Sequence, residues 1–388
     1  MAKNIFCGRT ADIPYADFMD LINRSFGFST PETQFLGLLP KLYREEHRPQ
    51  EQNYVVTEDG VLCTAVGAYD HTLTVGGDIL PCRGIGNVAT HPDYRSRGYM
   101  RLAMEAALDD MIRDRVALSY LGGRRHRYRY FSYEKAGECY TFSLNRDNLR
   151  HVWKDESAPF DTVRAVVDPD DPILECIKAI SDAGQVAPMR ARKDFLDISR
   201  SWHADLLMIA HQGGFKGYAI LGKEGSISEL RTVQAEDFLP ALRSVLVYTE
   251  RFSVTLTLPP FEAEAIAALM PVCEGVTCGC SMMYSVLDYG RVMKAFMNLK
   301  ATYATLPDGE ITLLIHGRGG DERLTVRVSE GAPSVTVASD ATPVECELFH
   351  SEAMEALFAP VSPLRDTLPA CCRLWFPLPL WIYRADGV

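Results

Sequence analysis

Apolar residues in the first 150 positions alternate between helical and strand-like spacing. Residues 16–26 and 31–43 have the periodicity of helices, and the second of these segments follows a Ser/Thr start. Three strand-like segments, separated by Asp-Gly and Gly-Gly-Asp turns, follow at 54–58, 61–69 and 72–89. An amphipathic helix and a buried strand at 116–121 come next. An antiparallel sheet that ends in a strand-helix-strand unit predicts a layered α+β fold.

A polar, proline-bearing stretch at 155–171 interrupts this pattern and marks a predicted domain junction. From there to Leu287, helices and strands alternate again. The predicted helices cover 173–183, 196–201 and 236–250, and the predicted strands cover 206–211, 217–222, 226–232 and 253–258.

The last hundred residues have a different texture. A helix at 289–299 precedes strands at 309–316, 323–329 and 334–338, and a second helix at 351–358 leads into a proline-rich, apolar end. We therefore predict three domains, with boundaries at 1–150, 151–287 and 288–388.

Composition narrows the class of protein. The chain has 388 residues, 47% of them hydrophobic, with no run of about 18 apolar residues and no apolar signal region near its start. We expect a cytoplasmic protein that does not associate with membranes. The formal net charge of -11 argues against nucleic acid as a partner and is compatible with cationic substrates.

Cysteine usage gives no metal or disulfide framework. There are 11 cysteines, an odd number, and we expect reduced core residues. Cys273, Cys278 and Cys280 cluster, and Cys371 is adjacent to Cys372, but neither group has the spacing of a zinc site. No metal is expected.

The segment 88–104, VATHPDYRSRGYMRLAM, carries the strongest functional signal. A strand end, an Arg/Gly-rich turn and a helix start bring backbone N–H groups, a helix N-terminus and the charges of Arg95, Arg97 and Arg101 to one point. A diphosphate fits this arrangement, and the last strand amides could bind a pantetheine arm as an added strand. A turn whose arginines only face solvent, without binding a phosphate, explains the same spacing equally well.

The same string resembles motif A of GNAT N-acetyltransferases, which binds the pyrophosphate of acetyl-CoA. The resemblance implies acetyl-CoA as co-substrate, and contacts to it from Val88, Ala89, Thr90, Arg95, Ser96, Arg97, Gly98, Tyr99, Met100, Arg101, Gly123 and Arg124. Met100 departs from the motif, in which many members have Gly or Ala. We expect its side chain on the buried face of the helix, away from the phosphates.

The whole chain resembles the enhanced-intracellular-survival (Eis) acetyltransferases, which have two GNAT modules followed by a sterol-carrier-protein-like α+β domain. The second module lacks an Arg-x-x-Gly turn after the strand at 227–232, so it is expected to be degenerate and structural. The family resemblance also implies a homohexamer. A helix-on-sheet core explains the last domain equally well without a lipid ligand.

The stretch GGRRHRYRYFSYEKAG resembles a second family motif and places Tyr128 on the catalytic tyrosine, with Ser132 in place of the usual glycine. A phenol could protonate the departing thiolate of CoA, whose conjugate acid has a pKa of about 8.5 if it is like a cysteine thiol. Without the resemblance, the aromatic residues here would be assigned to packing. His91 and His126 are expected to be a turn-stabilising residue and a surface residue.

A base must deprotonate the attacking ammonium. The resemblance implies the C-terminal carboxylate, which here belongs to Val388, although the end of this chain lacks the aromatic residue typical of the family. Asp386 is a rival base. The apolar approach at 374–382 would bury the tail against the first domain.

These observations predict an N-acetyltransferase that acetylates a cationic amine, such as an aminoglycoside, a polyamine or a lysine-like group, by direct attack in a ternary complex. No sequence-adjacent base suggests a nucleophile at Cys7, Cys63, Cys82 or Cys139. The alternative is a non-catalytic protein that binds acyl-CoA or a hydrophobic ligand as a sensor.

Overall fold

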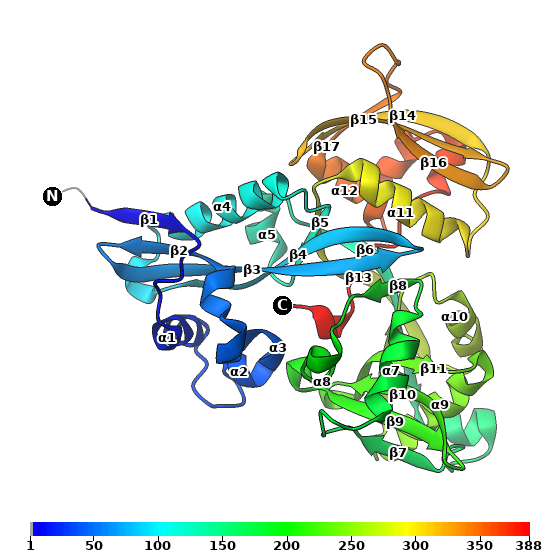
Figure 1. Ribbon diagram of the computed structural model, residues 1–388. Coiled ribbons are helices and arrows are strands. Elements are labelled where there is room, and N and C mark those ends of the chain that lie inside the picture. The colour runs from blue at the N-terminus through cyan, green and yellow to red at the C-terminus, as the bar shows by residue number, and fades with distance from the viewer. Residues whose placement is uncertain (1–2) are drawn as a thin grey trace.

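The computed structural model describes residues 3–388 and is organised around one 13-stranded sheet (Figure 1). The sheet begins with four antiparallel neighbours in chain order, β1 (Ile5–Gly8), β2 (Asn53–Glu58), β3 (Val61–Val75) and β4 (Asp78–Thr90). After α4 (Tyr99–Arg113), β5 (Leu118–Leu121) pairs parallel to β4. The predicted antiparallel sheet with a terminal strand-helix-strand unit is confirmed.

Helices cover both faces of these strands because apolar residues alternate along them. Val55 and Ala65 pack in one cluster with α1 (Tyr15–Phe26), whereas Tyr54 and Val66 pack in another with α4. Successive strand side chains point to opposite faces, so each strand contributes to two cores. The first unit is therefore a three-layer structure with the sheet in the middle.

Two predicted boundaries in this unit are wrong. The segment 31–43 forms two short helices, α2 (Phe35–Leu38) and α3 (Pro40–Tyr43), because Leu39 precedes a proline and leaves the helical region at φ -137°. Strand β3 does not stop at residue 69 but continues to Val75, where its far end pairs with both β4 and the short β8 (Val186–Pro188).

The second unit joins the first through an exchange of two strands that the sequence pattern did not indicate. β13 (Gly275–Val286) lies between β5 and β6 (Glu134–Asn145), and β6 in turn pairs with β12 (Ser253–Leu258). The sheet therefore runs without a break past residue 150. It continues through β11 (Ser226–Thr232), β10 (Gly214–Leu221), β9 (Asp205–His211) and β7 (Thr162–Ala165).

Helices of the second unit match the predicted pattern closely. α7 (Ile173–Asp182), α8 (Phe195–Ser199) and α9 (Phe238–Tyr248) occur where helical spacing was found. The structure also contains three short helices that the sequence pattern did not predict. α5 (Arg125–Tyr128) and α6 (Arg146–Asn148) lie in the first unit, and α10 (Ala263–Leu269) lies in the second.

The third unit has its own four-stranded sheet, in the order β16-β15-β14-β17. The helix α11 (Tyr289–Ala301) precedes the sheet, and α12 (His350–Phe358) and α13 (Ala370–Arg373) follow it. The four strands are β14 (Gly309–Gly317), β15 (Gly320–Ser329), β16 (Ala332–Val337) and β17 (Cys346–Phe349). Its core contains Ile311, Val326, Phe358 and Trp375. An α+β C-terminal unit is thus present, as predicted.

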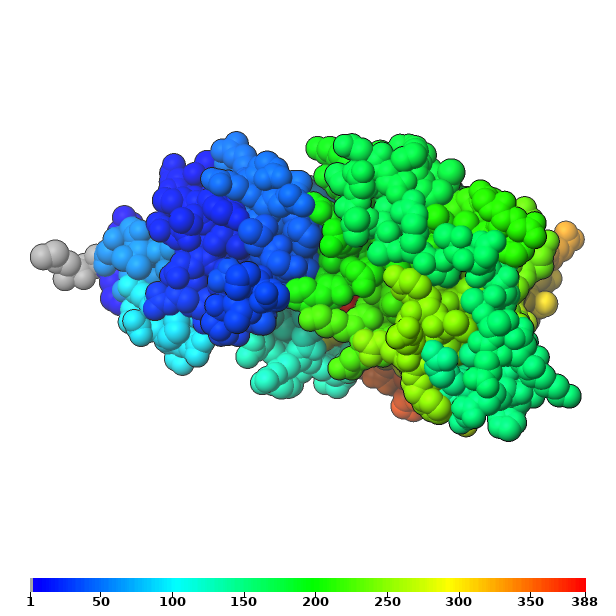
Figure 2. Space-filling view, turned by 90° about the horizontal axis from the view of Figure 1, so that it is seen from below, coloured from blue at the N-terminus to red at the C-terminus, as the bar shows by residue number. Residues whose placement is uncertain are grey.

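The end of the chain leaves this unit and runs back between the other two. Trp375, Leu378, Leu380 and Trp381 are buried along the way. Viewed from below, the blue N-terminal unit and the green middle unit meet, and a small part of the red C-terminal end is visible near their junction (Figure 2). No helix within residues 3–388 is long and apolar enough to cross a membrane.

A tight turn after α5 links the third unit to the first. Ser132 adopts the left-handed conformation at φ 67°, and its carbonyl oxygen lies 2.8 Å from Nε2 of His350 on α12. This φ explains the glycine that the family motif has here, since only glycine adopts it without strain.

Ser132→Gly should therefore stabilise the protein by about 0.5 to 1 kcal/mol, because the strain relieved exceeds the added chain entropy of glycine. Differential scanning calorimetry should show a rise in Tm of about 1 to 2 °C. The matched control is Ser226→Gly, at an ordinary φ of -77°, where glycine should lower Tm. A lower Tm for Ser132→Gly would contradict the argument.

Candidate active site

A cleft opens where two parallel strands separate. β4 and β5 pair from Cys82 opposite Leu118 to Ile85 opposite Leu121, where β5 ends while β4 continues to Thr90. Beyond Ile85, β4 keeps only β3 as a strand partner within the described chain. Its other edge borders a cleft of about 990 Å³. An extended chain of amides could pair with this edge.

A β-bulge shapes the wall of the cleft. Gly67 pairs with Gly86 and Ala65 with Ala89, so one residue of β3 faces two residues of β4, Asn87 and Val88. Asn87 has a φ of 34°. The bulge turns the backbone here out of the regular ladder, so that an amide could face the cleft.

Buried hydrogen bonds hold the bulge in place. The hydroxyls of Tyr43 and Tyr69 each donate to Oδ1 of Asn87 at 2.7 Å, and Nδ2 of Asn87 donates to Oδ1 of Asn53 at 2.7 Å. Because these groups are buried, leaving any of them unpaired would cost about 1 to 3 kcal/mol. The network therefore fixes a backbone conformation that is otherwise unfavourable.

The start of α4 borders the cleft. Gly98 is the N-cap at φ 82°, and no side chain caps the helix. Ser96, at φ 63°, also turns the preceding loop. Arg95 and Arg101 line the cleft beside these amides. A helix N-terminus with free N–H groups and two cationic side chains favours a diphosphate.

Most residues expected to contact the co-substrate lie along this cleft. They are Val88, Thr90, Arg95, Ser96, Gly98, Tyr99, Met100, Arg101, Gly123 and Arg124. Met100, expected on the buried face of the helix, instead is half-buried and borders the cleft, because it lies in the first turn. Ala89 does not line it, since its side chain is buried against the α1 face of the sheet.

Arg97 points away from the cleft. Its Nη1 donates to both carboxylate oxygens of Glu58, at 3.0 and 2.9 Å, and Glu58 also accepts from Tyr99. The hydrogen bond from Lys3, followed by those of Tyr99 and Arg97, lowers the pKa of Glu58 to about 2. In this structure the guanidinium of Arg97 anchors the loop to β2.

Tyr128 ends α5 on the opposite wall. Its side chain is buried, and burial raises its pKa above the usual value despite the opposing effect of Arg127. A Cβ on Gly123 would lie only 2.4 Å from the Tyr128 ring, so this glycine makes room for the ring. The phenol therefore stays protonated at neutral pH beside the cleft.

The last residue of the chain reaches the same cleft. Val388 lines it, and two glycines of β4 admit the tail: a Cβ on Gly84 would lie 2.6 Å from Cγ2 of Val388, and one on Gly86 would lie 3.2 Å from the carbonyl carbon of Val388. Residues two apart on a strand face the same side. Gly84 and Gly86 thus form a groove that sequence reasoning missed.

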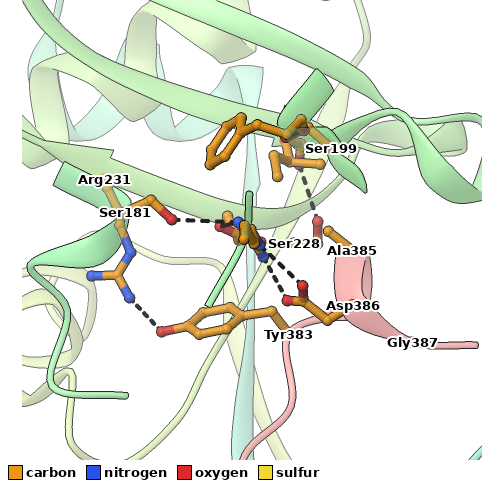
Figure 3. Close-up of polar contacts among 12 residues, drawn as sticks. Ser181, Ser199, Ser228, Arg231, Tyr383, Ala385, Asp386 and Gly387 are labelled. Atoms are coloured by element: carbon orange, nitrogen blue, oxygen red, sulfur yellow. Dashed lines mark hydrogen bonds and ion pairs between the residues drawn. The ribbon is translucent and has the colours of Figure 1, made fainter. Parts of the chain in front are cut away.

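A buried ion network fixes the segment just before Val388. Asp386 accepts from Nε and Nη2 of Arg190 at 3.0 and 2.6 Å, and Arg190 also donates to both oxygens of Glu229 at 3.1 and 2.6 Å. Figure 3 shows Asp386 and Tyr383 of the tail turned toward the middle unit, where Arg231 contacts the Tyr383 hydroxyl. Asp386, the rival base, is engaged here and does not line the cleft.

The first unit holds the tail from the other side. The Lys41 amine donates to the carbonyl oxygens of Ala385 and Gly387 at 2.5 and 2.8 Å, and the Tyr120 hydroxyl donates to that of Asp386 at 3.2 Å. Burial lowers the pKa of Lys41 to about 7, although the nearby Asp386 acts in the opposite direction. The tail is therefore fixed between two units.

The two histidines take the positions expected of them. His91 accepts a hydrogen bond from the backbone of Asp93 through Nδ1, at 3.3 Å, within the motif turn. His126 is exposed. Neither lines the cleft among the described residues.

Comparison with known proteins agrees with this geometry. Residues 10–136 match the model of the acetyltransferase (GNAT) domain. No curated protein matches the sequence.

Solved structures share the fold across most of the chain. A GCN5-related N-acetyltransferase from Kribbella flavida has 18% identity and a TM-score of 0.66, covering 100% of this chain and 97% of that one. A probable N-acyltransferase of unknown function from Enterococcus faecalis has 18% identity and a TM-score of 0.62, covering 90% and 87%. Eis1 from Mycobacterium abscessus has 14% identity and a TM-score of 0.54, also covering 90% and 87%.

At these identities, the solved structures establish the fold, and the family match establishes the first domain. Residues 10–136 form a GNAT acetyltransferase domain, an acyltransferase domain whose acyl donor is acetyl-CoA.

Proposed function

We propose that this chain is an N-acetyltransferase that moves the acetyl group of acetyl-CoA directly to a cationic amine in a ternary complex. The observation that carries the proposal is that Val388 and Tyr128 both line the cleft that the start of α4 borders. This places a carboxylate, a phenol and an anion site around one volume, although they are up to three hundred residues apart in the chain.

The co-substrate end of the cleft supplies binding groups. The amides at the start of α4, with Arg95 and Arg101, would hold the diphosphate, and Arg124 lies on the facing wall. The free edge of β4 would hold the pantetheine arm by backbone hydrogen bonds. Bound there, acetyl-CoA supplies an acetyl thioester, and a bulge amide near Val88 would stabilise charge on its carbonyl oxygen.

The α-carboxylate of Val388 is our proposed base. A terminal carboxyl has a pKa of about 3.3 to 3.7 in water, so it is a weak acceptor of the ammonium proton when solvated. The carboxylate carbon of Val388 lies against Gly86 on the cleft wall, where the ammonium of an acceptor bound in the cleft could reach it. The freed amine attacks the carbonyl carbon, a C–N bond forms and the C–S bond breaks.

Tyr128 is our proposed acid. Its hydroxyl donates a proton to the departing sulfur, and its raised pKa keeps that proton in place until the thiolate forms. The nitrogen loses two protons on its way from ammonium to amide: one to Val388 before the attack and one after the C–N bond forms. The second restores the proton that Tyr128 gives to sulfur, and the first leaves Val388 for solvent, so the net reaction releases one proton.

We also propose the division into units at 1–150, 151–287 and 288–388, with the middle unit a degenerate GNAT module. We further propose an Eis-like arrangement with a sterol-carrier-like C-terminal domain, a homohexamer and a cytoplasmic location. The fold shared with Eis1 from Mycobacterium abscessus supports the first of these.

Tyr128→Phe should lower kcat roughly 10²- to 10⁴-fold, because the thiolate would leave without a proton. Steady-state thiol release with acetyl-CoA and an amine measures kcat, and calorimetry measures the Kd for CoA, which should change less than about twofold. Wild-type activity should not decline on the alkaline side below about pH 10, since the pKa of Tyr128 lies above 10.0. Tyr248→Phe on α9, an exposed tyrosine, is the control. An undiminished kcat for Tyr128→Phe would refute the role.

Deletion of Val388 should lower kcat to a similar extent, because it withdraws the carboxylate by one residue, about 3.5 Å. Val388→Ala keeps the carboxylate and should retain most of the activity. If the deletion and the alanine variant lose activity equally, the side chain and not the carboxylate is required, and the proposed base is wrong.

Asp386→Asn separates the rival base from an anchoring residue. Arg190, despite the burial that would raise it, holds the pKa of Asp386 below its ordinary value of 3.8, so its stabilising contribution is present above that pH and is lost only below it. The variant should therefore lower Tm and reduce kcat by the same factor throughout pH 6 to 9. A changed pH-rate profile, with the acidic limb lost, would instead identify Asp386 as the base.

A further inference from the structure

The acceptor end of the cleft has a wall that the mechanism does not use. Phe26, Phe28 and Leu38 come from the α1–α2 region, on the opposite face of the sheet from α4, and Trp202 comes from the middle unit. Phe26, Phe28 and Phe35 contact one another, with ring centroids 5.0 to 5.5 Å apart. Val388 packs against this same cluster.

Most of the charged groups that line the cleft are cationic. Four arginines line it, and none of the lining residues in the described chain is an Asp or Glu. The one anionic group at the aromatic end is the α-carboxylate of Val388. A ligand with one ammonium could be paired there, whereas further ammonium groups would be desolvated without a partner, which is costly.

Trp202 is held in an unusual backbone conformation to form this wall. It has a φ of 63°, the next residue, His203, has a φ of 57°, and two successive non-glycine residues in this region are strained. Arg384 stacks 4.7 Å above the Trp202 ring on one side. Strain of this kind concentrates where a side chain must be aimed at a ligand.

We propose that the acceptor is a monoamine with an aromatic or apolar body, and not a polycation. This rests on the proposed function. The Val388 carboxylate binds the ammonium, the aromatic faces of the wall attract it further, and Phe26, Phe28 and Trp202 bury the apolar body. The net charge of -11 does not decide the substrate, because the local charges in the cleft are mostly positive.

The test compares 2-phenylethylamine, hexylamine, spermidine and an aminoglycoside as acceptors with the full-length enzyme and saturating acetyl-CoA. We expect kcat/KM for the two monoamines to exceed that for spermidine and the aminoglycoside by roughly tenfold or more. Faster turnover of either polycation would overturn the inference and leave the proposed function standing. Turnover of no amine, with CoA still bound, would overturn the proposed function itself.

Variants of Phe26 give a second readout, since this side chain is 45% exposed and its loss should not unfold the protein. Phe26→Ala should lower kcat/KM for 2-phenylethylamine roughly tenfold and lower that for spermidine by a clearly smaller factor, because spermidine loses only the attraction of the ring for its ammonium and not the burial of an apolar body. Phe26→Asp adds the missing acid and should shift the ratio toward spermidine. The matched control is Phe252→Ala, a 58% exposed phenylalanine of the middle unit. Equal effects of Phe26→Ala on both amines would overturn the assignment of this wall.

Discussion

The pairing of Arg190 with Glu229 and Asp386 is the interaction on which the cleft depends. Arg190 is 3% exposed, and its guanidinium binds both carboxylates through bidentate hydrogen bonds. Moving such ions out of water costs several kcal/mol each, and only a geometry in which every charged group is paired recovers that cost. The tail consequently has one well-defined docked position, and a loosely docked tail would leave Nε of the buried Arg190 without its hydrogen-bond acceptor.

The docked position of the tail determines where Val388 lies against the first unit. Only Gly387 lies between Asp386 and Val388, so fixing the carboxylate of Asp386 restricts the position of Val388 to within a few ångströms. The groove at Gly84 and Gly86 and the hydrogen bonds from Lys41 complete the restriction. A cleft built on β4 therefore becomes complete only after the middle and C-terminal units have folded, and the exchange of β6 and β13 ties the first two units into one sheet.

The sequence predicted the parts of the site that are local. The strand, turn and helix around Gly98 are coded within seventeen residues, and Tyr128 lies in a recognisable aromatic stretch. The sequence did not indicate that Arg190 pairs with Asp386. The two residues are 196 positions apart, and a single sequence carries no signal for a pairing over that separation. Strand β13 was missed because its Gly, Cys and Ser residues lack the β-branched character that marks a strand. The break at Leu39 could have been found from the following proline.

The different charges at the two ends of the cleft would also make the acceptor amine bind more strongly than its acetylated product. In the proposed reaction, an ammonium at the aromatic end would be attracted by the carboxylate of Val388, and the arginines at the other end would attract only the phosphates of acetyl-CoA. Acetylation converts that ammonium into a neutral amide. The amide forms no ion pair, so the carboxylate of Val388 no longer attracts the bound molecule through its charge. The proposed site would therefore bind the reacting amine more strongly than the amide it produces, while the apolar wall would hold both alike. An acceptor recognised by several carboxylates would lose only part of its attraction on acetylation, so a cleft with one anion favours release of product after a single transfer.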